Sequence, residues 1–200
     1  SLKQIDMPDK PIAVSFTLLN NTAYFNDASN WKDGVLYVDG YLIRAGEGFY
    51  GKTECIVPEG TIVIAEHAFS DSKQVRALKK VTLPQSLVCI GSYAFSQCSQ
   101  LAEIEIGDGI QSIGYNAFSG TAYESANWTD NGLYLGNWLI AVKNEEMTSF
   151  TVREGTVGIA DGYDDNSSSF FPKKARNITA LSLPSTLKYI GVRSFARLKI

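Results

Sequence analysis

The chain has few of the residues on which metal and nucleophilic sites depend. It holds a single histidine, His67, among its 200 residues, and its three cysteines, Cys55, Cys89 and Cys98, form no C-x-x-C pair. One histidine rules out most histidine-based metal sites and leaves little for a Ser-His-Asp relay. An odd cysteine count without such a pair predicts neither a disulfide framework nor a zinc site. We therefore expect no cofactor, no metal and no enzymatic activity.

Strong charge and long apolar runs are missing too. The formal net charge is −3, whereas nucleic-acid binding usually needs a basic face. No apolar run approaches the roughly 20 residues that cross a membrane, and the opening SLKQIDMPDKP has no apolar segment of a signal peptide. We expect no nucleic-acid partner and no membrane span, and we expect the chain to be part of a longer protein.

What the sequence does contain is a repeat. IGSYAFSQCSQL begins at Ile90, and IGYNAFSGTAY begins at Ile113, 23 residues later. The shared frame is apolar-x-apolar-Pro, two residues, an apolar residue, two residues, Ile-Gly, two residues and Ala-Phe. Its phenylalanines are Phe69, Phe95, Phe118 and Phe195. Intervals of 26 and 23 residues are typical of stacked repeat proteins.

A longer period lies above the short one. TAYFNDASNWKDGVLYVDGYLIRA begins at Thr22 and TAYESANWTDNGLYLGNWLIAV begins at Thr121, and their tryptophans, Trp31 and Trp128, lie 97 residues apart. An EGT repeat follows each block. The chain is therefore a supermodule of hairpin plus repeats, used about twice.

The hairpins are predicted from their turns. Asp-Gly at 39–40 and Gly-Asn at 136–137 each separate two strand-like runs. Such pairs adopt the positive φ that two-residue hairpin turns demand. Antiparallel hairpins are therefore expected near 34–45 and 131–142.

Each repeat also supplies one short strand, and a single strand cannot bury its apolar face unless neighbouring coils stack. The predicted fold class is a mainly β repeat solenoid, a right-handed coil of short parallel strands with interspersed β-hairpins. The expected parallel strands are 54–57, 80–83, 103–106, 149–152 and 180–183. Three divisions of the chain are expected, the first being a degenerate N-terminal repeat or linker (1–21). The first supermodule (22–121) contains hairpin 31–45 and repeats near 55–80, 81–103 and 104–121. The second supermodule (122–200) contains hairpin 128–143 and repeats near 150–180 and 181–200.

Within a coil, Ile90 is expected to point inward and Gly91 to form a tight corner. Ala65 and Ala160 occupy the same place in other copies, so this corner needs a small residue more than positive φ. The phenylalanines of successive coils should stack as a ladder at aromatic spacing.

The pattern resembles the BspA-like leucine-rich repeats of bacterial surface proteins, over about residues 20–200. The resemblance is carried by Leu83-Pro84, Ile90-Gly91, Ala94-Phe95, Cys98 and Leu101, with echoes at Ile113-Gly114, Ala117-Phe118 and Ile190-Gly191. It implies a leucine-rich-repeat-like coil that is extracellular or on the bacterial cell surface. It also implies adhesion to host matrix proteins or other cells, and no active site.

One coil departs from the frame. Arg153 and Pro184 are 31 residues apart, whereas Pro58 and Pro84 are 26 apart. The coil after Gly155 is therefore about five residues longer, and Phe170 or Phe171 is expected to supply its ring. Its loop gathers four oxygen-bearing side chains, Asp161, Asp164, Asp165 and Asn166. A solvated loop is the favoured interpretation because the EF-hand order is absent, and a calcium site is the alternative.

Candidate binding residues lie on the outward rows of the strands, since alternate residues face the same side. One row is Ile56, Thr82, Glu105, Thr151 and Ser182, and the next is Glu54, Lys80, Glu103, Ser149 and Ala180. Neither row has an aromatic stripe of the kind that binds sugars. Tyr41 and Trp138, just past the hairpin turns, are the better aromatic candidates, with hairpin packing as their favoured alternative.

Two functions remain open. The first is a non-catalytic, surface-exposed or secreted binding scaffold for a macromolecular ligand, such as a host matrix or cell-surface protein. The alternative is a carbohydrate-binding accessory module of a larger cell-surface protein, with a glycan on Tyr41 and Trp138. Cys55 and Cys98 should be buried and reduced, Cys89 should be a free surface thiol, and His67 an exposed coil residue.

Overall fold

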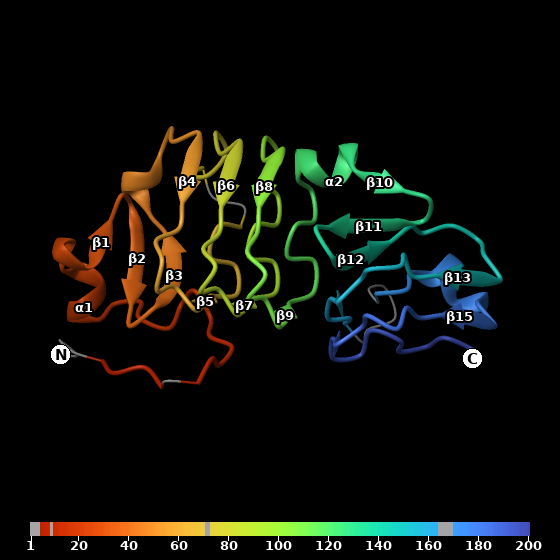
Figure 1. The fold of residues 1–200 in the computed structure, drawn as a ribbon. Coiled ribbons are helices and arrows are strands. Elements are labelled where there is room, and N and C mark those ends of the chain that lie inside the picture. Colours follow the sequence, from red (N-terminus) through yellow and green to blue (C-terminus); the bar gives the residue numbers. More distant parts are fainter. Residues whose placement is uncertain (1–4, 9, 71–72, 164–169) are drawn as a thin grey trace.

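The computed structural model describes residues 5–8, 10–70, 73–163 and 170–200. Successive repeats place short strands in two groups that lie on opposite sides of a shared core (Figure 1). Strands dominate and the helices are few and short, as the repeat pattern predicts. The handedness of the coil stays a prediction.

The predicted parallel strands are confirmed, each about one residue shorter than expected. β4 (Glu54–Ile56), β6 (Lys80–Thr82) and β8 (Glu103–Glu105) form one sheet, and β13 (Ser149–Thr151) and β15 (Ala180–Ser182) form another. The register follows the sequence intervals, because Cys55 pairs with Val81 and Val81 with Ile104. The 31-residue interval of the longer coil also matches the strand register, because Phe150 pairs with Leu181.

A second set of parallel strands was not predicted. Each returning segment forms a two-residue strand: β5 (Val63–Ile64), β7 (Cys89–Ile90), β9 (Ser112–Ile113), β14 (Gly158–Ile159) and β16 (Tyr189–Ile190). Ile64, Ile90 and Ile113 all point into the core, where they are buried, and this part of the prediction is confirmed. Runs of two residues are too short to show the alternation that marks a strand in sequence.

Both hairpins are confirmed. β2 (Val35–Val38) pairs with β3 (Tyr41–Ala45), and β11 (Gly132–Leu135) pairs with β12 (Trp138–Val142). Positive φ occurs at Asp39, Gly40 and Gly136, as the turns require.

The hairpins are built into the sheets of the returning strands. A short strand precedes each one, β1 (Trp31–Lys32) or β10 (Trp128–Thr129), and before it lies a short helix, α1 (Ala23–Asn26) or α2 (Ala122–Ala126). The strand orders are β1-β2-β3-β5-β7-β9 and β10-β11-β12-β14-β16. The described residues also form 3₁₀ helices at Ala28–Asn30, Glu47–Phe49 and Lys173–Asn177.

The phenylalanine ladder is confirmed. The rings of Phe69 and Phe95 stack with centroids 5.0 Å apart, and those of Phe95 and Phe118 stack at 5.3 Å. All three are buried, and burial of each ring stabilises the fold by about 2–3 kcal/mol. In the longer coil Phe171 supplies the ring, since it is fully buried and lies 6.1 Å from Phe195.

The corner glycine behaves as expected. A Cβ on Gly91 would lie 2.5 Å from the backbone nitrogen of Glu66, and its φ is not positive. In four coils the left-handed backbone falls two residues later, at residues that are not glycine: His67, Tyr93, Asn116 and Arg193. No sequence signal marks this position, because its side chains differ in every copy.

The N-terminal segment packs where a preceding coil would lie. The Glu66 amide donates to the carbonyl oxygen of Val14 at 2.8 Å, and the Asp161 amide donates in the same way to Ile113 at 2.8 Å. Val14 therefore occupies the place that Ile113 holds for the second supermodule. This supports a degenerate repeat before residue 22, while the module boundaries stay a prediction.

Candidate binding surface

The structure brings six of the predicted binding residues together on one exposed face. Parallel pairing sets Glu54, Lys80 and Glu103 in one row, and Ile56, Thr82 and Glu105 in the next. The sheet of β4, β6 and β8 carries both rows (Figure 1). We call these six residues the strand face.

The middle of the strand face is held by charge pairs. The Lys80 ammonium lies 2.8 Å from a Glu105 carboxylate oxygen and 3.9 Å from Glu103, and the Thr82 hydroxyl donates to Glu105 at 3.0 Å. The hydrogen bond with Glu105 raises the pKa of Lys80, and the same bond lowers the pKa of Glu105. Three glutamates against one lysine leave the face acidic, with Ile56 exposed at its edge.

The outward rows do not run through all five strands, as the sequence analysis assumed. Thr151 and Ser182 are exposed, but they lie on the separate sheet of β13 and β15. The chain between β8 and β13 forms α2 and the strands β10, β11 and β12, which lie between the two sheets (Figure 1). The candidate surface is therefore limited to three strands.

The packing interpretation of Tyr41 and Trp138 is confirmed, because neither ring is exposed. The Tyr41 hydroxyl bonds to the backbone of the N-terminal segment, at Pro8, Lys10 and Ile12. Trp138 stacks on Tyr189 at 5.8 Å and lies across Gly158, where a Cβ would be 2.5 Å from the indole. Neither ring can serve as a platform for a sugar.

A row of aromatic rings on the returning side was missed. Neighbouring centroids are 4.8–5.6 Å apart along Phe16, His67, Tyr93, Tyr115 and Tyr163. His67 is therefore only half exposed, stacked on Tyr93 and bonded to the Ser70 hydroxyl. The contacts of Phe16 with His67 and of Tyr93 with Tyr115 are edge-to-face, and the other two are stacked. Tyr115 is buried and Tyr163, at the end of the row, is exposed, so the row chiefly stabilises the turns.

The cysteines carry no reactive chemistry. All three are free thiols, and Cys55 and Cys98 are buried, as predicted. Burial raises the pKa of Cys55 to about 12 and that of Cys98 to about 12, and it also raises the pKa of Cys89. Cys89 is half buried rather than a surface thiol, because its side chain packs with the cluster around the first hairpin.

The calcium alternative falls mostly on residues 164–166, which lie outside the described residues. Of that group only Asp161 is described, and its carboxylate accepts a hydrogen bond from the Val192 amide at 2.8 Å. Within the described part of the chain, no three His, Cys, Asp or Glu side chains gather in a way that could hold a metal ion.

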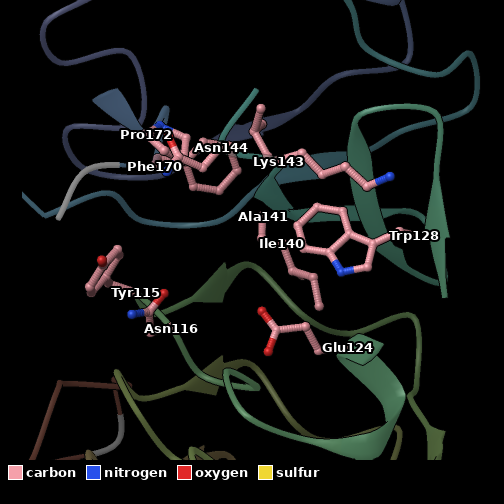
Figure 2. Close-up of a pocket in the computed structure, with 11 residues that line it drawn as sticks. Tyr115, Asn116, Glu124, Trp128, Ile140, Ala141, Lys143, Asn144, Phe170 and Pro172 are labelled. Atoms are coloured by element: carbon pink, nitrogen blue, oxygen red, sulfur yellow. The ribbon is translucent and has the colours of Figure 1, made fainter. Parts of the chain in front are cut away.

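Two clefts lie at equivalent places in the two modules. The first, of about 540 Å³, is lined by Phe25, Trp31 and Arg44. The second, of about 430 Å³, lies between α2, the first residue of β10 and the end of β12, and we call it the α2 cleft (Figure 2). Its lining includes Asn116, Glu124, Trp128, Ile140, Lys143 and Phe170.

Stacked coils of short parallel strands with an outward charged strand face define a leucine-rich-repeat scaffold. The chain belongs to the BspA type leucine rich repeat region family, whose model matches residues 48–162 in six copies. No curated protein matches the chain. None of the described helices is long and apolar enough to cross a membrane.

Three solved structures are similar to the chain. They are the leucine rich repeat protein TpLRR of T. pallidum (18% identity, TM-score 0.44, 86% of this chain and 89% of that one), a leucine rich cell surface protein of Faecalibacterium prausnitzii (20%, 0.45, 84% and 41%) and the pneumococcal vaccine antigen PcpA (19%, 0.41, 84% and 38%). The chain thus spans less than half of the last two proteins.

Proposed function

We propose that the chain is a non-catalytic binding scaffold, surface-exposed or secreted, that mediates adhesion or protein–protein interaction. The observation that carries this proposal is the register of β4, β6 and β8, which aligns six outward side chains on one exposed face. Repeat proteins bind through such extended surfaces because each coil contributes only a few side chains. Membership of the BspA-type family supports the same function.

The charge of the strand face suggests the chemistry of the partner. Glu54, Glu103 and Glu105 outnumber Lys80, and Lys80 is already paired with Glu105. Complementary charge speeds association and favours correct partners. The proposed partner is a host matrix or cell-surface protein with a basic patch. A carbohydrate module built on Tyr41 and Trp138 has lost its support, since both rings are buried.

The proposal is tested with two matched double variants. Thr82→Arg with Glu105→Arg reverses the charge at the centre of the strand face. Thr151→Arg with Ser182→Arg also introduces two arginines, on the outward side of β13 and β15, where both residues are exposed. Interface energy concentrates near the centre of a contact, so the first variant should weaken binding to immobilised extracellular-matrix proteins by about tenfold or more.

The second double variant should bind like the unaltered protein in surface plasmon resonance. Both variants should keep the melting temperature nearly unchanged, because exposed substitutions usually cost under about 0.5 kcal/mol. Equal binding by the two variants, or binding to none of the matrix proteins, would contradict the proposal.

A further inference from the structure

The two clefts differ in the hydrogen bonding of the tryptophan indole N–H. In the first, the Trp31 indole N–H donates to the carbonyl oxygen of Phe25 at 2.8 Å. In the α2 cleft, the indole N–H of Trp128 finds no acceptor anywhere in the described chain, and its recorded contact is the Lys143 ammonium, 5.8 Å from the ring centroid. Trp128 is half buried, and its indole nitrogen is not among the buried atoms that lack a partner, so this N–H is open to solvent and free to donate to a ligand.

The cause of this difference lies in the sequence. Ten residues run from Thr22 to Trp31, but only eight run from Thr121 to Trp128. The shorter connection removes the 3₁₀ turn that follows α1 and places Trp128 directly after α2. The indole edge that bears the nitrogen then faces the side of the cleft where Glu124 lies (Figure 2).

Two further polar side chains that line the cleft have hydrogen-bonding groups without a partner among the described residues. One carboxylate oxygen of Glu124 accepts from the Gly120 amide at 2.6 Å, while the other has no partner among the described residues. Asn116 occupies the left-handed corner position, with φ of 52°. Its side-chain amide forms no hydrogen bond with any described group. In the equivalent position of the neighbouring coils, His67 and Tyr93 stack on each other instead.

The cleft therefore combines an aromatic ring with unpaired donors and acceptors. Trp128 and Lys143 supply donors, Glu124 an acceptor, and the Asn116 amide one of each. Ile140 and Phe170 add buried apolar wall, and the cleft volume falls in the range of small-ligand sites. A sugar matches this mixture, because each hydroxyl both donates and accepts while the carbon face of the ring is apolar.

We propose that the α2 cleft binds a saccharide, with the Trp128 indole N–H donating to a sugar oxygen and Asn116 and Glu124 bonding its hydroxyls. This site lies apart from the strand face and does not depend on it. In the first cleft the indole N–H of Trp31 is already bonded to Phe25. The unpaired donor there is Nε of Arg44, which is buried, and the Arg44 guanidinium lies over the rings of Phe16 and Phe25. The saccharide site therefore belongs to the second supermodule alone.

The experiment follows the indole N–H signals by NMR. The chain has three tryptophans, Trp31, Trp128 and Trp138, so three resonances are expected, and Trp128→Phe assigns one of them. The probes are methyl glycosides of glucose, galactose and N-acetylglucosamine, their disaccharides, and a proline-rich peptide. At millimolar concentration, at least one saccharide should shift the Trp128 signal and leave those of Trp31 and Trp138 in place.

A matched pair of glycine variants tests the role of the amide. Asn116→Gly removes the side chain from a left-handed position without strain, and Arg193→Gly makes the same change at the equivalent corner of another coil. Asn116→Gly should weaken saccharide binding by about tenfold, while Arg193→Gly should leave it unchanged. The strand-face variant with arginines at 82 and 105 should also keep the saccharide shift, which separates this site from the proposed protein contact.

The proposal is overturned if no saccharide of the panel moves the Trp128 signal, if the peptide moves it and the sugars do not, or if the two glycine variants bind alike.

Discussion

At the residue scale, the core positions of the repeat are the ones that a sequence can predict. Phe69, Phe95 and Phe118 recur at a fixed place in the frame, and the structure buries all three. The Cys98 thiol, also buried, donates to the Phe69 carbonyl oxygen at 3.1 Å. The period alone indicates that these side chains share one environment. The period does not predict whether Tyr41 and Trp138 are exposed or buried, because their burial depends on segments distant in sequence that cover them.

The thiols allow a test of the core at this scale. In a Cys89→Ser variant, Cys55 and Cys98 should remain unreactive towards a disulfide reagent at a pH of about 8.5, where an unfolded cysteine is half ionised. Burial raises both folded pKa values to about 12, so almost no thiolate forms in the folded protein. Both thiols should react at once in urea.

The same shift sets a pH dependence of stability. The folded pKa is raised, so the stability that these thiols contribute is complete below their unfolded pKa of about 8.5 and is lost as the pH rises towards about 12. Rapid reaction of two thiols in the folded variant would contradict their burial.

At the element scale, the sequence predicts the longer and better punctuated segments. The hairpins are marked by their turn residues, and the strands β4, β6 and β8 by an apolar-x-apolar pattern next to a fixed proline or glycine. The two-residue returning strands carry no such pattern. Their pairing is set by the stacking of coils, which is a tertiary effect that local propensity does not contain.

The first hairpin turn gives the prediction for this scale. Gly40 has φ of +79°, and a Cβ there would lie 2.7 Å from the carbonyl oxygen of Gly60. Gly155 has a similar φ of +83° with nothing within 4 Å. Both alanine variants should lose about 1–2 kcal/mol to left-handed strain, and Gly40→Ala should lose more because the backbone of the neighbouring coil must also move.

Urea unfolding of Gly40→Ala and Gly155→Ala measures the difference directly. Equal free energies of unfolding would show that the turn does not press on the next coil.

At the scale of the whole molecule, the face beyond β15 and β16 is the place where repeat positions are left uncovered. Ile190 is 55% exposed, whereas Ile90 and Ile113, its equivalents in earlier coils, are 0% and 1% exposed. Val192 is exposed beside it. Both strands are edge strands of their sheets among the described residues. A polypeptide of these 200 residues therefore presents an open strand edge with apolar side chains, which favours pairing with a second copy in solution.

The prediction is that Ile190→Lys with Val192→Lys lowers concentration-dependent self-association in sedimentation velocity. The melting temperature should hold, since both side chains are already in solvent. Ile56→Lys, the same change on another exposed edge strand, is the control and should have little effect. If all three proteins sediment alike, this face takes no part in association.

The candidate sites were predictable only in part. The strand face follows from the repeat register, which the sequence intervals contain. The α2 cleft was not found, because Asn116 stands at a variable position of the short repeat while Glu124 and Trp128 belong to the longer block, and only the folded chain brings them together. The two-residue difference between the blocks around Trp31 and Trp128 was visible in the sequence, and it is the signal that could have pointed there.

The hairpin at the start of each returning sheet gives the array a direction. On one side the sheet ends in β1 or β10, each only two residues long, and on the other it ends in a parallel strand, β9 or β16. A further coil inserted between β7 and β9 would pair with a parallel strand on each side. A coil inserted before β3 would instead replace the antiparallel pairing of β2 with β3. In each of these sheets the hairpin therefore lies toward one end, and all the parallel strands follow on the same side of it.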